Sequence, residues 1–86
     1  MANTQKQYTI SVQRIRLHGD NPAPKSYTGT IAELTKSFSY TLECGHSWDG
    51  RVNRSPKTIG SLVTNLNRAA AANSTHYQSE YYSLTN

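Results

Sequence analysis

Three stretches of this chain have the pattern of a β-strand. In the first, apolar side chains alternate with polar ones from Tyr8 onward, and the strand ends at the glycine- and proline-containing turn segment 18–24. The alternation changes phase at Ile15, which predicts a β-bulge or a change in the surroundings of the strand. The tail, residues 75–85, is rich in strand-forming residues and predicts the last strand.

The most regular alternation covers residues 38–48. Apolar or aromatic side chains and one histidine occupy every second position of this stretch: Phe38, Tyr40, Leu42, Cys44, His46 and Trp48. Strict alternation places such residues on one face of a strand. The pattern therefore predicts a half-buried strand in the middle of the chain.

Two segments have the signals of a helix. Thr30 and Glu33 fit a capping box, which predicts a short helix directly after them. Ser55 and Pro56 favour a second helix start, with Ser55 as the N-cap. The apolar residues that follow at helical spacing predict a long helix ending near residue 73: Ile59, Leu62, Val63, Leu66 and Ala69.

These elements predict a small two-layer α+β domain. An antiparallel or mixed sheet of three or four strands, including an edge strand near Tyr27, packs against one long and one short helix. The 86 residues form a single domain, with residues 1–6 flexible. A chain of this length buries only about 60–65% of the surface that it exposes when unfolded. The thin core favours self-association into a homo-oligomer.

The charge balance favours an anionic partner. Nine Lys and Arg residues against five Asp and Glu residues give a net charge of +4. Phosphates, nucleotides, nucleic acids and acidic protein surfaces all suit such a charge. The N-terminal residues lack the apolar run of a signal peptide or membrane anchor, and a lone cysteine allows no internal disulfide. We expect a cytoplasmic protein without a membrane partner.

A first candidate site lies at the predicted start of the long helix. Arg51, Arg54 and Lys57 surround Ser55, whose hydroxyl and neighbouring backbone N–H groups are expected to point toward the same spot. Cations and a helix N-terminus together attract an anion. This segment is a candidate to bind a phosphate or an acidic side chain; the alternative is that Ser55 simply caps its own helix and that the cations are solvated. It lacks the glycine-rich pattern of a nucleotide-hydrolysing loop.

A second candidate surface is basic and aromatic. Arg14 and Arg16 point the same way from the first strand, and Lys25 follows the turn. Tyrosine rings are expected beside these cations: Tyr40, Tyr77, Tyr81 and Tyr82. Rings among basic groups bind single-stranded nucleic acid or nucleotides.

The pair Cys44 and His46 has three interpretations. Both are zinc ligands, but His18 and His76, the other histidines, do not complete a usual zinc pattern. A Cys–His catalytic pair requires hydrogen-bond contact, which two positions about 6.5 Å apart along a strand make difficult. A sheet face packed on a helix explains the pair best. We therefore expect no metal, no cofactor and no catalytic residues.

The stretch 26–70 is similar to small uncharacterised proteins of tailed bacteriophages. Two runs carry the resemblance, YTLECGHS at residues 40–47 and SPKTI at residues 55–59. The resemblance implies a non-enzymatic binding protein that inhibits or sequesters a host protein, as in host takeover or anti-defence. A nucleic-acid- or nucleotide-binding module is the alternative, and a small zinc protein or enzyme is the third hypothesis.

Overall fold

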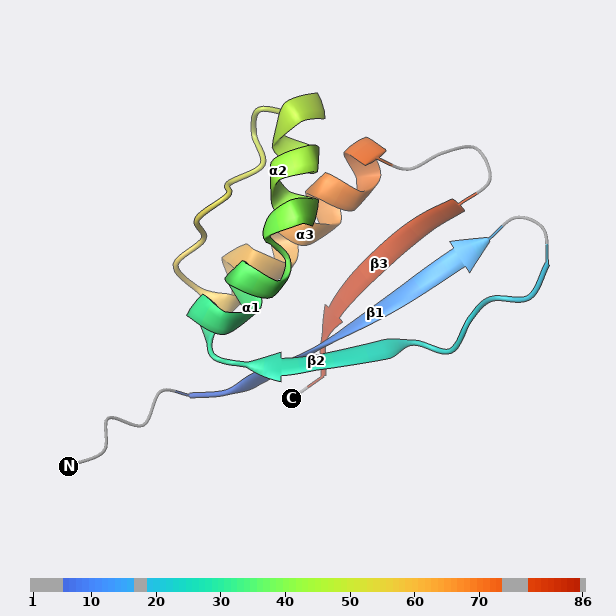
Figure 1. Ribbon diagram of the computed structural model, residues 1–86, viewed down its shortest axis with the longest axis horizontal. Helices are drawn as coiled ribbons and strands as arrows, with labels where there is room; N and C mark the ends of the chain where they lie inside the picture. Colours follow the sequence, from blue (N-terminus) through green and yellow to red (C-terminus); the bar gives the residue numbers. More distant parts are fainter. Residues whose placement is uncertain (1–5, 17–18, 74–77, 86) are drawn as a thin grey trace.

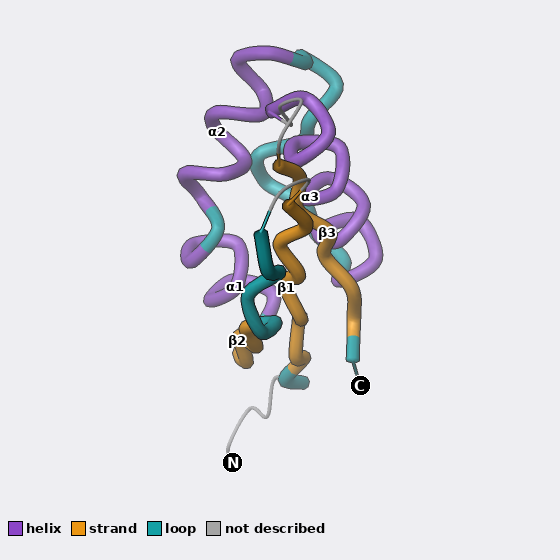
Figure 2. Tube along the Cα trace, turned by 90° about the vertical axis from the view of Figure 1, so that its right-hand side faces the viewer, coloured by secondary structure: helices purple, strands orange, loops and turns teal. Residues whose placement is uncertain are grey.

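The computed structural model describes residues 6–16, 19–73 and 78–85. Within these ranges the elements follow in the order β1 (Tyr8–Arg16), β2 (Lys25–Gly29), α1 (Ile31–Ser37), α2 (Ser39–Trp48), α3 (Ile59–Asn73) and β3 (Gln78–Leu84). Strand β1 lies in the middle of the sheet and is antiparallel to both neighbours, in the order β2-β1-β3. The helices lie on one side of this sheet (Figure 1), with α1 next to β2 and α3 next to β3 (Figure 2). The predicted two-layer α+β class is confirmed.

The two faces of the sheet differ in character. On the helix-facing side, Ile10 lies between Tyr27 of β2 and Leu84 of β3, and it is fully buried. The opposite face carries no charged side chain among the described strand residues, which are Thr9, Ser11, Gln13, Ile15, Ser26, Thr28, Ser79, Tyr81 and Ser83. The register between β1 and β3 has no interruption from Ile10 to Arg16. The predicted bulge is therefore wrong, and Ile15 lies on the open face, 47% exposed.

Helix α1 begins as the sequence predicts. The Thr30 hydroxyl accepts the Glu33 N–H at 3.2 Å, and the Glu33 carboxylate accepts the Thr30 N–H at 2.8 Å. This reciprocal pair is a capping box. The extended stretch near Tyr27, predicted as an edge strand, is β2.

The predicted strand at residues 38–48 is wrong, because these residues form the helix α2. Its buried face is formed by Phe38, Leu42 and Gly45, which recur at helical spacing. Tyr40, Cys44 and Trp48 also recur every four residues, and the two rings are 80% and 76% exposed. The apparent period of two therefore arises from two interleaved helical stripes, one buried and one exposed.

Helices α2 and α3 approach each other most closely at Gly45. A Cβ atom at this position would lie 2.6 Å from the Cα atom of Ala69 and in direct conflict with its Cβ atom. Only glycine allows this approach, since ordinary contacts between carbon atoms require about 3.5–4 Å. The close contact brings Leu42 and Leu66 into the fully buried core.

The core joins all the elements. Phe38, at the junction of α1 and α2, contacts Tyr27 and Tyr82 edge-to-face, with ring centroids 5.0 Å and 5.5 Å apart. Such aromatic pairs add to the energy of burial. The buried hydrophobic residues are Ile10, Leu34, Phe38, Leu42, Val52, Leu62, Leu66, Ala69, Ala70 and Tyr82.

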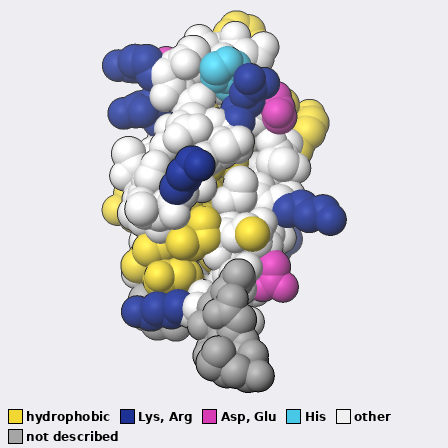
Figure 3. Space-filling model, turned by 90° about the vertical axis from the view of Figure 1, so that its left-hand side faces the viewer, with side chains coloured by type: hydrophobic (Ala, Val, Ile, Leu, Met, Phe, Trp, Pro, Cys, Tyr) yellow, Lys and Arg dark blue, Asp and Glu magenta, His cyan; other side chains and the backbone are white. Residues whose placement is uncertain are grey.

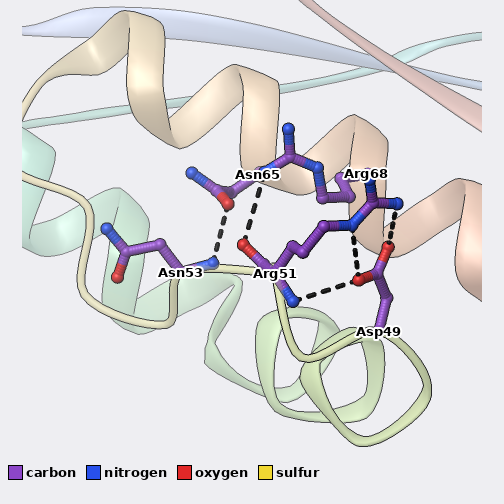
Figure 4. Close-up of polar contacts among 5 residues, drawn as sticks. All are labelled: Asp49, Arg51, Asn53, Asn65 and Arg68. Atoms are coloured by element: carbon purple, nitrogen blue, oxygen red, sulfur yellow. Dashed lines mark hydrogen bonds and ion pairs between the residues drawn. The ribbon is translucent and has the colours of Figure 1, made fainter.

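The linker between α2 and α3 is fixed by buried contacts. Val52 and Pro56 are buried, and the side chain of the buried Asn65 accepts the Asn53 N–H at 2.7 Å (Figure 4). Helix α3 begins at Ile59, where the Thr58 hydroxyl accepts the Ser61 N–H at 3.1 Å. The predicted helix start with Ser55 as the N-cap is therefore wrong.

Replacing Gly45 by alanine tests the close helix contact. We expect Gly45→Ala to destabilise the fold by about 1–3 kcal/mol, because the added methyl group overpacks the contact with Ala69. Gly60→Ala is the matched control, since a Cβ atom there has nothing within 4 Å. It should stabilise the fold slightly, through the better helix propensity of alanine. Urea unfolding that shows Gly45→Ala to be as stable as Gly60→Ala would contradict the packing.

Candidate functional site

A shallow basic hollow lies between α1, the linker and the start of β1. It has a volume of about 780 Å³. Four of its lining residues carry hydrophobic side chains, namely Tyr8, Ile31, Ala32 and Pro56. Four others are cationic, namely Lys6, Lys36, Arg54 and Lys57. Figure 3 shows this face of the molecule, where hydrophobic side chains form a patch and Lys and Arg side chains stand around it.

The cations of the basic hollow are largely unneutralised. No Asp or Glu occurs among the described residues that line it. Arg54 pairs with Glu43 of α2 at 3.1 Å, but both side chains are about half exposed, at 49% and 60%. Exposed ion pairs of this kind contribute little, because water screens them. Neither Lys36 nor Lys57 forms an ion pair within the described part of the chain.

The structure divides the predicted set Arg51, Arg54, Ser55 and Lys57. Three of these residues line the basic hollow, whereas Arg51 does not. The helix N-terminus is also absent from the site, because α3 begins at Ile59 and the Ser55 N–H donates to Asn53 Oδ1 at 2.9 Å. The N-terminus of α3 therefore does not contribute to the attraction of this surface for anions.

Arg51 is occupied by an acidic neighbour. Its guanidinium donates to both carboxylate oxygens of Asp49, at 3.0 Å and 2.9 Å, and its backbone carbonyl accepts from Arg68 at 3.3 Å (Figure 4). The hydrogen bonds from Arg51 lower the pKa of the Asp49 carboxyl to about 2. This pair fixes the turn after α2 and leaves Arg51 less available to a ligand.

The other candidate residues gather in a second concavity, the tyrosine cleft, of about 560 Å³. It is lined by Arg14, Arg16 and Lys25 together with the rings of Tyr27, Tyr40 and Tyr82. Tyr81 does not belong to it, because the strand register places Tyr81 on the opposite face of the sheet, 57% exposed. Tyr77 lies outside the described residues.

One carboxylate, Glu80, lines the tyrosine cleft. It accepts from Arg14 at 2.9 Å and from the Tyr82 hydroxyl at 3.2 Å. Burial, together with the charge of Glu80, raises the pKa of Tyr82 to about 12. The Tyr82 hydroxyl therefore stays protonated at neutral pH. Glu80 forms its ion pair with Arg14, and not with Arg16 or Lys25.

Cys44 and His46 do not converge. On a helix, residues two positions apart point about 200° from each other. The Nδ1 atom of His46 lies 2.9 Å from the Val52 carbonyl oxygen, so this side chain faces the linker. Cys44 lies one helical turn after Tyr40 on α2, and interaction with the Cys44 side chain raises the pKa of Tyr40. The described residues contain no cluster of three metal-ligating side chains, and His18 and His76 lie outside them.

Lys6 and Lys36 are cations of the basic hollow that the sequence did not reveal. Lys36 has the position of an ordinary basic residue in the last turn of a helix. Lys6 precedes β1, and its amine lies 5.4 Å from the centre of the Tyr8 ring. Only the folding of the linker against α1 brings these lysines near Arg54 and Lys57.

No protein-family model, curated protein or solved structure matches this chain. Among the described residues, no helix has both the length and the apolar character that a membrane-spanning segment requires. The resemblance to phage proteins therefore stays a prediction, and any inference about function depends on the two concave surfaces.

Removing Arg51 tests the electrostatics of the turn. We expect Arg51→Ala to raise the pKa of Asp49 from about 2 part of the way toward its ordinary value of 3.8. The two side-chain hydrogen bonds are lost, whereas the backbone N–H of residue 51 still donates to Asp49 Oδ1. A carbon-detected NMR titration of Asp49 between pH 6 and pH 2.5 measures this change. An Asp49 carboxyl that titrates near pH 3.8 in the unmodified protein would contradict the pair.

Proposed function

We propose that this protein is a small non-enzymatic binding protein, and that its basic hollow holds an acidic, partly apolar segment of a partner protein. One observation carries this proposal: an apolar floor surrounded by cations, without a carboxylate among the described lining residues. A partner segment with an apolar anchor flanked by Asp or Glu would use both features of the hollow. The apolar floor supplies affinity, and the cations supply specificity and orientation.

The composition of the basic hollow favours a protein partner over a nucleic acid. A phosphate backbone would use Lys36, Arg54 and Lys57 but would leave the partly exposed apolar side chains uncovered, namely Tyr8, Ile31 and Ala32. Burying an apolar anchor adds about 25 cal/mol for each Å² removed from water. This gain persists at high salt, whereas contacts with phosphates weaken steeply.

The linker makes the surface suitable for specific binding. Val52 and Pro56 are buried, and Asn53 is hydrogen-bonded to Asn65, so the wall that carries Arg54 and Lys57 is held before a partner arrives. A surface that is already ordered loses little conformational entropy on binding. In the biological setting that the resemblance implies, the bound segment would belong to a bacterial host protein that a phage inhibits or sequesters.

Selection from a random peptide library tests this proposal, because the library itself reveals which peptide chemistry the hollow prefers. We expect the immobilised protein to enrich peptides that combine one or two large apolar residues with several Asp or Glu residues. The double variant Lys36→Glu/Lys57→Glu should bind the selected peptide at least tenfold more weakly, because charge-assisted contacts turn into repulsion. Both lysines are exposed, so the melting temperature should change little.

Arg16→Glu/Lys25→Glu is the matched control, because it changes the net charge by the same amount at residues that do not line the basic hollow. It should leave the affinity for the selected peptide within about twofold of the unmodified protein, apart from general electrostatics that salt removes. Selected peptides without acidic residues, or an affinity that the lysine variant leaves unchanged at 150 mM salt, would contradict the proposal.

A further inference from the structure

The tyrosine cleft is a second, separate concave surface, on the other side of the α1–α2 junction. Lys36 and Ser39 line the basic hollow, whereas Ser37, Phe38 and Tyr40 line the tyrosine cleft. Strands β1 and β3 extend beyond the helices at the end of β1 that carries Arg14 and Arg16 (Figure 1). The helix-facing side of the sheet is therefore open there, and it is charged rather than apolar.

The wall of the tyrosine cleft opposite the helices is held by defined contacts. The backbone N–H of Arg16 donates to Asn21 Oδ1 at 2.8 Å, and the Gln13 amide donates to the Pro22 carbonyl at 3.1 Å. Pro22 and Ala23 consequently lie against β1 and line the cleft. The cleft is thus preformed, which reduces the entropy that a ligand must overcome.

The cations of the tyrosine cleft exceed its carboxylates. Glu80 is bonded to Arg14 and Tyr82. Within the described ranges, neither the Arg16 guanidinium nor the Lys25 amine forms an ion pair. The strand register pairs Lys25 with Val12 and places Arg16 four residues further along β1, so the two cations lie apart on the same side of the sheet. Both line the cleft and are available to the phosphate groups of an anionic ligand.

An exposed aromatic ring lies next to these cations. Tyr40, in the first turn of α2, lines the tyrosine cleft although its side chain makes little contact with the protein, at 80% exposed. Tyr27 is 38% exposed, and its ring is fixed edge-to-face against Phe38. A ring beside cations suits a flat, negatively charged ligand, because the base can stack on the ring while the cations contact the phosphate.

We propose that the tyrosine cleft binds a nucleotide unit of a single-stranded nucleic acid. Arg16 and Lys25 contact phosphates of the strand at this unit, and its base stacks on Tyr40. Stacking on tyrosine accepts any base, so binding depends little on sequence. An acidic peptide without aromatic residues would pair with the cations but would leave the Tyr40 ring uncovered. A duplex keeps its bases paired and stacked on one another, so it cannot use Tyr40 in this way.

Fluorescence anisotropy with a labelled 12-nucleotide oligothymidylate tests the proposal. Two or three phosphate contacts to single-stranded nucleic acid predict that log K falls with log salt concentration with a slope of about −1.4 to −2.1. Arg16→Glu/Lys25→Glu should weaken binding at least tenfold and make the slope shallower. Tyr40→Ala should weaken binding about fivefold or more with an unchanged slope, because stacking does not release counterions. Tyr40→Phe should retain most of the affinity.

Three control variants separate the tyrosine cleft from the rest of the surface. Tyr81→Ala removes an exposed ring from the opposite face of the same sheet, and Trp48→Ala removes one from α2 outside the cleft. Lys36→Glu/Lys57→Glu changes the same amount of charge in the basic hollow. None of the three should reduce oligonucleotide affinity more than about twofold at 150 mM salt, where the Debye length is about 8 Å.

Competition identifies the source of the nucleotide. Unlabelled oligothymidylate should displace the label at a concentration at least tenfold lower than thymidine monophosphate, and a 12-base-pair duplex should compete more weakly than the single strand. Equal competition by the monophosphate would overturn the assignment to a strand, and equal competition by the duplex would overturn stacking on Tyr40. Absence of binding at 50 mM salt, or equal losses in the Tyr40→Ala and Tyr81→Ala variants, would overturn the proposal as a whole.

Discussion

The contact between Gly45 of α2 and Ala69 of α3 is the constraint on which the rest of the structure depends. Because no side chain separates the two backbones there, Leu42 and Leu66 both reach the thin core. The linker that joins the two helices then folds back with Val52 inside, and it carries Arg54 and Lys57 toward α1. The close approach of the two helices thus positions the linker wall of the basic hollow.

Local signals in the sequence predicted much of the fold but not α2. The capping box of Thr30 and Glu33 and the alternation from Tyr8 depend on neighbouring residues, so they could be read directly. In residues 38–48, two helical stripes together imitate the alternation of a strand. The residue that distinguishes the helix from a strand is Gly45, which packs against Ala69 of α3. Because Ala69 is distant in the sequence, this contact could not be recognised from the residues around Gly45. Tertiary packing here overrides the local pattern.

The candidate site residues that lie on a strand could be predicted from the sequence, whereas those that lie on the linker could be predicted only in part. Arg14 and Arg16 share a face because residues two apart on a strand do so, and the structure brings both into the tyrosine cleft. At the linker, counting cations was insufficient. Asp49 pairs with Arg51, the helix starts later than Ser55, and Lys36 joins the surface from another element. The basic hollow is therefore formed by a different set of cations from the predicted one, with Lys6 and Lys36 in it and Arg51 outside it.

The two concave surfaces should bind different ligands independently of each other. Amide chemical shifts in a ¹⁵N-labelled sample, recorded with an acidic apolar peptide and then with oligothymidylate, test this independence most directly. The peptide should shift the amide signals of α1 and of residues 54, 55 and 57. The oligonucleotide should shift the amide signals of Arg14, Arg16, Lys25 and Tyr40. Saturation with one ligand should leave the affinity for the other ligand unchanged. Both ligands shifting the same amides, or the uncharged open face around Gln13 and Tyr81, would contradict the assignment of two separate sites.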